Sequence, residues 1–169
     1  MPGAEQLPLA GLIEAAVGLS NAGQTANARQ LYQLWIDHNR SHPQLYVAYF
    51  NCAALASQLR DHAAAAASLS EAISLNPDFV PAYINLGRIY EEAGATRHAV
   101  DLWRLAVSRA TPINGSAMQY AITALTQIAR VSNAAQQGEE AEDAIRQCLE
   151  INPRQADMVE QYTALRLAQ

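Results

Sequence analysis

The sequence contains no lysine, and this absence removes several kinds of chemistry at once. All 11 basic residues among the 169 positions are arginine. A phosphate-loop lysine, a Schiff-base lysine and a kinase-type lysine are therefore excluded for this chain. The 11 cationic residues stand against 16 acidic ones. Since binding to a phosphate backbone needs a concentrated basic surface, we expect no nucleic-acid partner.

Cysteine and long apolar runs are also scarce. The two cysteines, Cys52 and Cys148, form no spacing pattern and predict buried thiols in a reducing compartment. No apolar run approaches the roughly 20 residues that span a bilayer. The first residues, Met-Pro-Gly-Ala-Glu, lack the charged and apolar stretches of a signal peptide. We therefore expect a cytoplasmic protein without membrane contact.

Combinations of residues that carry catalysis are missing as well. His38 and His42 have a spacing that two metal ligands on one helix would show, but Pro43 follows directly and no acidic or thiol partner is near in sequence. No serine–histidine–acid set, carboxylate pair or glycine-rich phosphate loop can be defended. We expect no metal, no cofactor and no catalytic site, so the chain is predicted not to be an enzyme.

What the sequence does contain is alanine and a helical repeat. Hydrophobic residues make up 50% and charged residues 16% of the chain, which favours an α-rich protein of one domain, residues 1–169. The clearest unit spans residues 80–111. Its apolar and small positions fall on two helical faces separated by a turn glycine: Tyr83, Leu86, Gly87, Tyr90, then Gly94, then Ala99, Trp103 and Ala106.

Related patterns precede and follow this unit. The predicted repeats are residues 9–43, 46–79, 80–111 and 117–153, and an amphipathic segment at 155–168 is predicted to be a capping helix or the first helix of a further unit. The fourth copy has Ser132 where an aromatic is expected, and an insertion at 111–116 precedes it. Glu139, Glu140, Glu142 and Asp143 stand at the start of the second helix of this fourth copy and are expected to complement its positive end.

The residue types explain why such units stack. A small residue such as Gly87 lets the second helix approach the first closely. Large residues, Tyr83, Tyr90 and Trp103 among them, are expected to fill the space between neighbouring pairs, which no single pair can bury alone. This pattern resembles the tetratricopeptide repeat. The resemblance implies an all-α, right-handed α-α superhelix of four helix pairs plus a C-terminal capping helix.

The resemblance also implies a function and a site. Solenoids of this type bind a peptide or partner protein in a concave groove lined by the first helices. Residues off the core stripe are then candidates for peptide binding: Phe50, Asn51, Ile84, Asn85, Arg88, Gln127 and Arg130. The alternatives are that Phe50 and Ile84 pack on a neighbouring helix and that the arginines are ordinary solvated residues.

Two aligned asparagines suggest a particular branch of the family. Asn51 and Asn85 occupy the same position in successive units, and an amide that both donates and accepts can hold an extended backbone. Residues 75–87 resemble the superhelical region of O-linked N-acetylglucosamine transferases and their bacterial SPINDLY-like relatives. Glu14 and Gln127 replace the other two asparagines. The resemblance implies a substrate-recruiting arm of a glycosyltransferase whose catalytic domain is absent here.

Two further possibilities concern the partner. A clamp for a terminal carboxylate is poorly supported, because Ile13, Val17 and Pro81 stand where such a clamp needs polar or basic groups. Self-association through an exposed end of the solenoid, around Tyr162 and Leu165, stays open.

Overall fold

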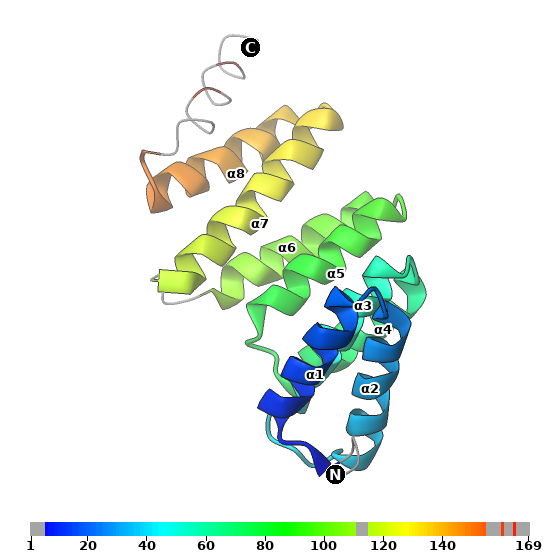
Figure 1. The fold of residues 1–169 in the computed structure, drawn as a ribbon. Coiled ribbons are helices and arrows are strands. Elements are labelled where there is room, and N and C mark those ends of the chain that lie inside the picture. Colours follow the sequence, from blue (N-terminus) through cyan, green and yellow to red (C-terminus); the bar gives the residue numbers. More distant parts are fainter. Residues whose placement is uncertain (1–5, 111–114, 155–159, 161–163, 165–169) are drawn as a thin grey trace. The chain divides into compact units, whose positions relative to one another are not determined.

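The computed structural model describes residues 6–110 and 115–154, together with positions 160 and 164. Within these residues the regular elements are eight α-helices (Figure 1). They are α1 (Leu9–Asn21), α2 (Thr25–His38), α3 (Leu45–Gln58), α4 (His62–Leu75), α5 (Val80–Glu92), α6 (Thr96–Arg109), α7 (Gly115–Ala134) and α8 (Gly138–Ile151). The all-α class predicted from the sequence is confirmed.

The chain divides into two compact units, Met1–Ala82 and Tyr83–Gln169. In unit 1, α1 packs on α2, α2 on α3, and α3 on α4. The interior combines small and large side chains, as the repeat pattern requires. Leu12, Ala28 and Ala48 are fully buried, and Tyr32 and Trp35 fill the space beside them. Neighbouring helices therefore pack in sequence order within this unit.

Unit 2 repeats this arrangement around a tryptophan. The side chain of Trp103 on α6 is fully buried, and its Nε1 donates a hydrogen bond to the Ile84 carbonyl oxygen at 3.2 Å. A Cβ placed on Gly87 would lie 2.4 Å from Trp103 Nε1, a distance that Cβ contacts do not reach. Position 87 on α5 must therefore be glycine for the indole to pack there. The α7 helix packs in turn on α6 and α8.

The turn inside each helix pair has the same backbone geometry. Positive φ angles occur at Gly23 (75°), Arg60 (60°), Gly94 (79°) and Gln136 (57°), directly after the first helix of each pair. The next backbone N–H then donates to a carbonyl five residues earlier, as from Asp61 to Ala56 at 2.9 Å. This is the Schellman ending of a helix, and it occurs four times.

Several expectations need correction or lie outside the described residues. Tyr90 was expected in the core, but its side chain is 37% exposed and stacks on His98 with ring centroids 5.7 Å apart. Tyr90 lies in the last turn of α5, and its ring packs on the first turn of α6, at the surface and not in the core. The α7 helix starts at Gly115, ahead of the predicted repeat boundary at 117, so part of the insertion is helical. The predicted helix 155–168 and the residues around Tyr162 lie outside the described residues.

Candidate functional site

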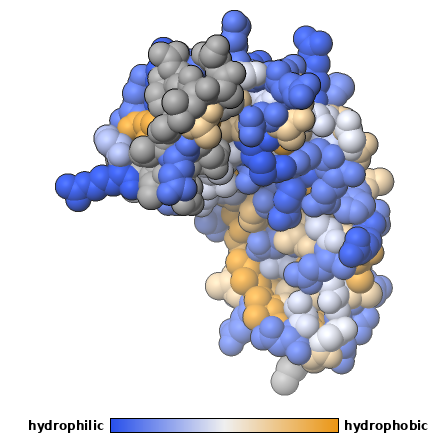
Figure 2. Space-filling view, turned by 90° about the horizontal axis from the view of Figure 1, so that it is seen from above, coloured by the Kyte–Doolittle hydropathy of each residue, from blue (hydrophilic) through white to orange (hydrophobic). Residues whose placement is uncertain are grey.

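A cavity of about 200 Å³ opens in unit 1 between α1 and α3. Helix α1 contributes Ile13, Ala16, Val17 and Ser20, helix α3 contributes Asn51, Ala54, Leu55 and Gln58, and Tyr32 of α2 completes the lining. Val17 is 52% exposed, which is unusual for a large apolar side chain beside a core. Figure 2 shows that hydrophobic residues gather in one area of an otherwise largely hydrophilic face.

Of the residues that the sequence proposed for peptide binding, Asn51 lines this cavity. Ile13 and Val17, which were considered for a terminal-carboxylate clamp, line it as well, together with Ala54. They converge because the first helix of each pair lies on the same side of unit 1. The sequence did not indicate that Ser20, Tyr32, Leu55 or Gln58 would line this cavity. Gln58 could have been found, because it lies seven residues after Asn51 and therefore on the same helical face.

Asn51 and Tyr32 lie close together in the lining of this cavity. The side chain of Tyr32 is almost fully buried and interacts with that of Asn51. Burial raises the pKa of the Tyr32 hydroxyl, and the hydrogen bond from Asn51 lowers it by less. The phenol therefore stays neutral at physiological pH.

Phe50 lies next to Asn51 but does not line the cavity. Its ring packs edge-on against Phe79, which follows α4, with centroids 5.1 Å apart. Tyr46 contacts the same ring at 4.9 Å. The half-buried Phe50 therefore helps to pack α3 against the segment that precedes α5.

The other five candidates lie in unit 2. Ile84 and Asn85 are half-buried on α5, and the exposed Arg88 is within 4.0 Å of Glu92. On α7, Arg130 donates to both carboxylate oxygens of Glu91 at 2.7 Å and to Gln127 Oε1. Arg130 thus ties α7 to α5 through a charged contact, and Gln127 supports the guanidinium from the same helix.

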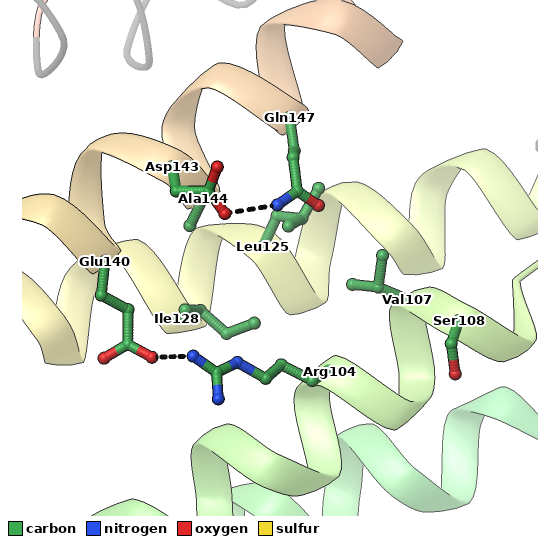
Figure 3. A pocket seen from close by; sticks show the side chains of 9 residues that line it. All are labelled: Arg104, Val107, Ser108, Leu125, Ile128, Glu140, Asp143, Ala144 and Gln147. Atoms are coloured by element: carbon green, nitrogen blue, oxygen red, sulfur yellow. Dashed lines mark hydrogen bonds and ion pairs between the residues drawn. The ribbon is translucent and has the colours of Figure 1, made fainter.

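A second cavity of about 320 Å³ lies among α6, α7 and α8 (Figure 3). Its floor is apolar, and one wall is formed by the ion pair between Arg104 and Glu140. Ser132, which is 1% exposed, donates its hydroxyl to Glu140 Oε2 at 3.0 Å. The sequence explained Glu140 only by the dipole of α8. Its role as acceptor depends on residues brought together by folding.

Sulfur and imidazole groups do not combine into a metal site in the part of the chain that the structure describes. No group of three or more His, Cys, Asp and Glu side chains there is placed to hold an ion. Cys52 and Cys148 are free and buried, and burial raises the pKa of both thiols. The His42 ring packs against Trp35 at 5.1 Å. No described helix is long and apolar enough to cross a membrane.

The class of the protein follows from comparison with known families. Residues 46–79 match the family described as tetratricopeptide repeat. These bounds coincide with the second repeat predicted from the sequence. No curated protein matches the chain.

Solved structures extend this result to the fold of the chain. BtubC (BKLC) from P. vanneervenii matches with a TM-score of 0.77 at 13% identity, over 98% of this chain and 74% of that one. MamA matches with a TM-score of 0.70 at 20% identity, over 86% and 79%. PilF of Pseudomonas aeruginosa matches with a TM-score of 0.67 at 14% identity, over 96% and 67%. The chain therefore carries a tetratricopeptide repeat and has the all-α solenoid fold of these structures.

Proposed function

We propose that the chain is a protein-interaction module that binds a segment of another polypeptide in the groove between α1 and α3. The observation that carries this proposal is the cavity that joins Ile13, Val17, Asn51 and Ala54. An exposed apolar surface in a hollow, bordered by amide groups, suits the side chains and backbone of a peptide. Five residues on α5 and α7 are proposed as additional contacts with the bound polypeptide: Ile84, Asn85, Arg88, Gln127 and Arg130.

Asn51 and Asn85 give the most direct test. Partners would be identified by cross-linking and mass spectrometry with the full chain, and the affinity of the main partner measured by calorimetry. Each asparagine is expected to contribute one hydrogen bond worth about 0.5–1.5 kcal/mol. Asn51→Ala together with Asn85→Ala should therefore weaken binding by about five- to hundredfold.

The matched control is Asn27→Ala, which removes an exposed asparagine from α2 outside the cavity. It should leave the affinity unchanged. Equal affinity of the double variant and the unmodified chain would contradict the groove mechanism, and thermal unfolding would show that both variants are folded.

A second candidate function is that of the substrate-recruiting arm of a glycosyltransferase. The recurrence of asparagine at positions 51 and 85 of successive repeats favours it, together with the resemblance of residues 75–87 to that family. The natural reading frame decides the matter: continuation past Gln169 into a nucleotide-sugar-binding domain supports this function, and a stop codon there contradicts it. We also propose that the chain is located in the cytoplasm, as expected from the sequence.

A further inference from the structure

The cavity between α1 and α3 has the size of one side chain. Its volume is about 200 Å³. A cavity of about 150 Å³ lined by apolar residues holds one benzene molecule, whereas sites for drug-sized ligands begin at about 300 Å³. The cavity therefore has room for one branched aliphatic or aromatic side chain and is too small for a typical cofactor.

The lining of the cavity selects against charge. Five of its nine residues are apolar (Ile13, Ala16, Val17, Ala54 and Leu55), and the other four are neutral: Ser20, Tyr32, Asn51 and Gln58. A carboxylate or ammonium group entering it would lose water without gaining an opposite charge, which is costly. An apolar side chain would instead cover Val17, which is 52% exposed.

The polar groups on α3 have the spacing of an extended backbone. Asn51 and Gln58 are seven residues apart on one face of the helix, which corresponds to about 10.5 Å along its axis. Three residues of extended chain cover about the same length. Ala54 and Leu55 lie between the two amides. The helix thus presents an amide, an apolar surface and a second amide in the order in which a peptide presents a backbone group, a side chain and another backbone group.

Unit 2 does not repeat this arrangement. One repeat length of 34 residues further along, Asn51 corresponds to Asn85, but Arg88 stands in place of Ala54 and Glu92 in place of Gln58. Arg88 and Glu92 lie within 4.0 Å of each other. A charged pair thus replaces the apolar surface of α3, so the arrangement of an apolar surface between two amide groups is found in unit 1 and not on α5.

We propose that this cavity is a specificity subsite for one large, uncharged aliphatic or aromatic side chain of an extended polypeptide, with Asn51 and Gln58 holding the backbone on either side. This inference rests on the proposed function, and it specifies which kind of side chain the bound polypeptide must carry.

A panel of short peptides tests this subsite. The peptides have the form acetyl-Gly-Ser-Ala-Xaa-Ala-Ser-Gly-amide, with Leu, Phe, Gly, Asp or Lys at the central position. They are titrated to millimolar concentration into the isotope-labelled full chain, and backbone amide shifts are followed by NMR. The Leu and Phe peptides should shift resonances of α1 and α3 and bind at least about tenfold more tightly than the Gly, Asp and Lys peptides.

Two variants locate the site. Ala54 is exposed, so Ala54→Leu fills the cavity without disturbing the core and should abolish binding of the Leu and Phe peptides. The matched control is Ala67→Leu, the same substitution at an exposed position of α4 outside the cavity, which should bind as the unmodified chain does. Asn51→Ala together with Gln58→Ala should lower the affinity of every peptide that binds.

The outcomes separate the two proposals. Binding at α1 and α3 that is equal for the five peptides, or that survives Ala54→Leu, would overturn the subsite and leave the groove in place. Binding confined to unit 2 would overturn the subsite and still support an interaction module. If no peptide caused saturable shifts, the groove and the subsite would both be wrong.

Discussion

Four single residues set the turns inside the helix pairs, and only two of them are glycine. Gly23 and Gly94 adopt the left-handed conformation easily because they have no Cβ. Arg60 and Gln136 adopt it with φ of 60° and 57°. For a residue with a side chain this conformation costs roughly 1–2 kcal/mol. The backbone hydrogen bonds that end each helix hold these two residues in place.

Replacing Arg60 by glycine should therefore stabilise the protein. Relief of the steric cost is partly offset by the greater freedom of glycine in the unfolded chain, so we expect a gain of about 0.5–1 kcal/mol. The measurement is urea unfolding followed by circular dichroism. Arg60→Ala keeps the Cβ and serves as control. An equal gain from Arg60→Ala would show that loss of the arginine, and not relief of the backbone, was responsible.

At the scale of elements, Asp61 links two helices of unit 1. Its side chain caps α4 by accepting from the Ala64 N–H at 3.1 Å and accepts from Arg29 Nη1 of α2 at 2.8 Å. The hydrogen bond from Ala64, followed by that from Arg29, lowers the pKa of the Asp61 carboxyl below its ordinary value. Both interactions need the ionised carboxylate at full strength. They therefore stabilise the fold only where Asp61 is deprotonated.

The sign of the pH dependence follows from this lowered pKa. The stabilisation is present above the pKa of the unfolded chain, about 4, and is lost as the pH falls through the lower pKa of the folded chain. Asp61→Asn keeps a capping oxygen but loses the charge. Urea midpoints measured from pH 7 downward should show the largest difference between the two proteins above about pH 4. A difference that does not change with pH would contradict this account.

The helices also show which parts of the fold can be predicted from sequence patterns. The second repeat was placed at residues 46–79 from a helical pattern related to that of residues 80–111, and the family match covers the same residues. Local patterns suffice there because each helix pair is built from residues close in sequence. Tyr90 was misplaced because the pattern gives the face of a helix and not how deeply each side chain on that face is buried; the ring packs on His98 at the surface.

For the whole molecule, the division into two units predicts how damage spreads. Repeat proteins are stabilised by neighbouring contacts, so a lesion in one part need not unfold the rest. Gly87→Ala places a Cβ against the buried Trp103 indole in unit 2. Overpacking of this kind costs about 1–3 kcal/mol.

Hydrogen exchange measured by mass spectrometry should show where this cost is felt. In Gly87→Ala, protection should fall first in α6, α7 and α8, while α1 to α4 keep theirs. Gly18→Ala on α1 is the matched control, because no atom lies within 4 Å of its added Cβ; it should preserve or raise protection. Equal loss of protection from α1 to α8 would show that the two units unfold as one.

The candidate site was only half predictable at this scale. Asn51 and Val17 could be placed off the core stripe from helical spacing alone. That their side chains line one cavity together with Tyr32 depends on the distance between α1 and α3. The sequence contains no direct record of that distance.

By itself the sequence determined the helices, their pairing and the absence of lysine chemistry, because helical periodicity, turn residues and composition are local properties. The tertiary structure decided which residues share a cavity, and that Ser132, Glu140 and Arg104 form one hydrogen-bonded group. Those contacts join side chains on different helices. Their geometry is set by packing, which no spacing along the chain specifies.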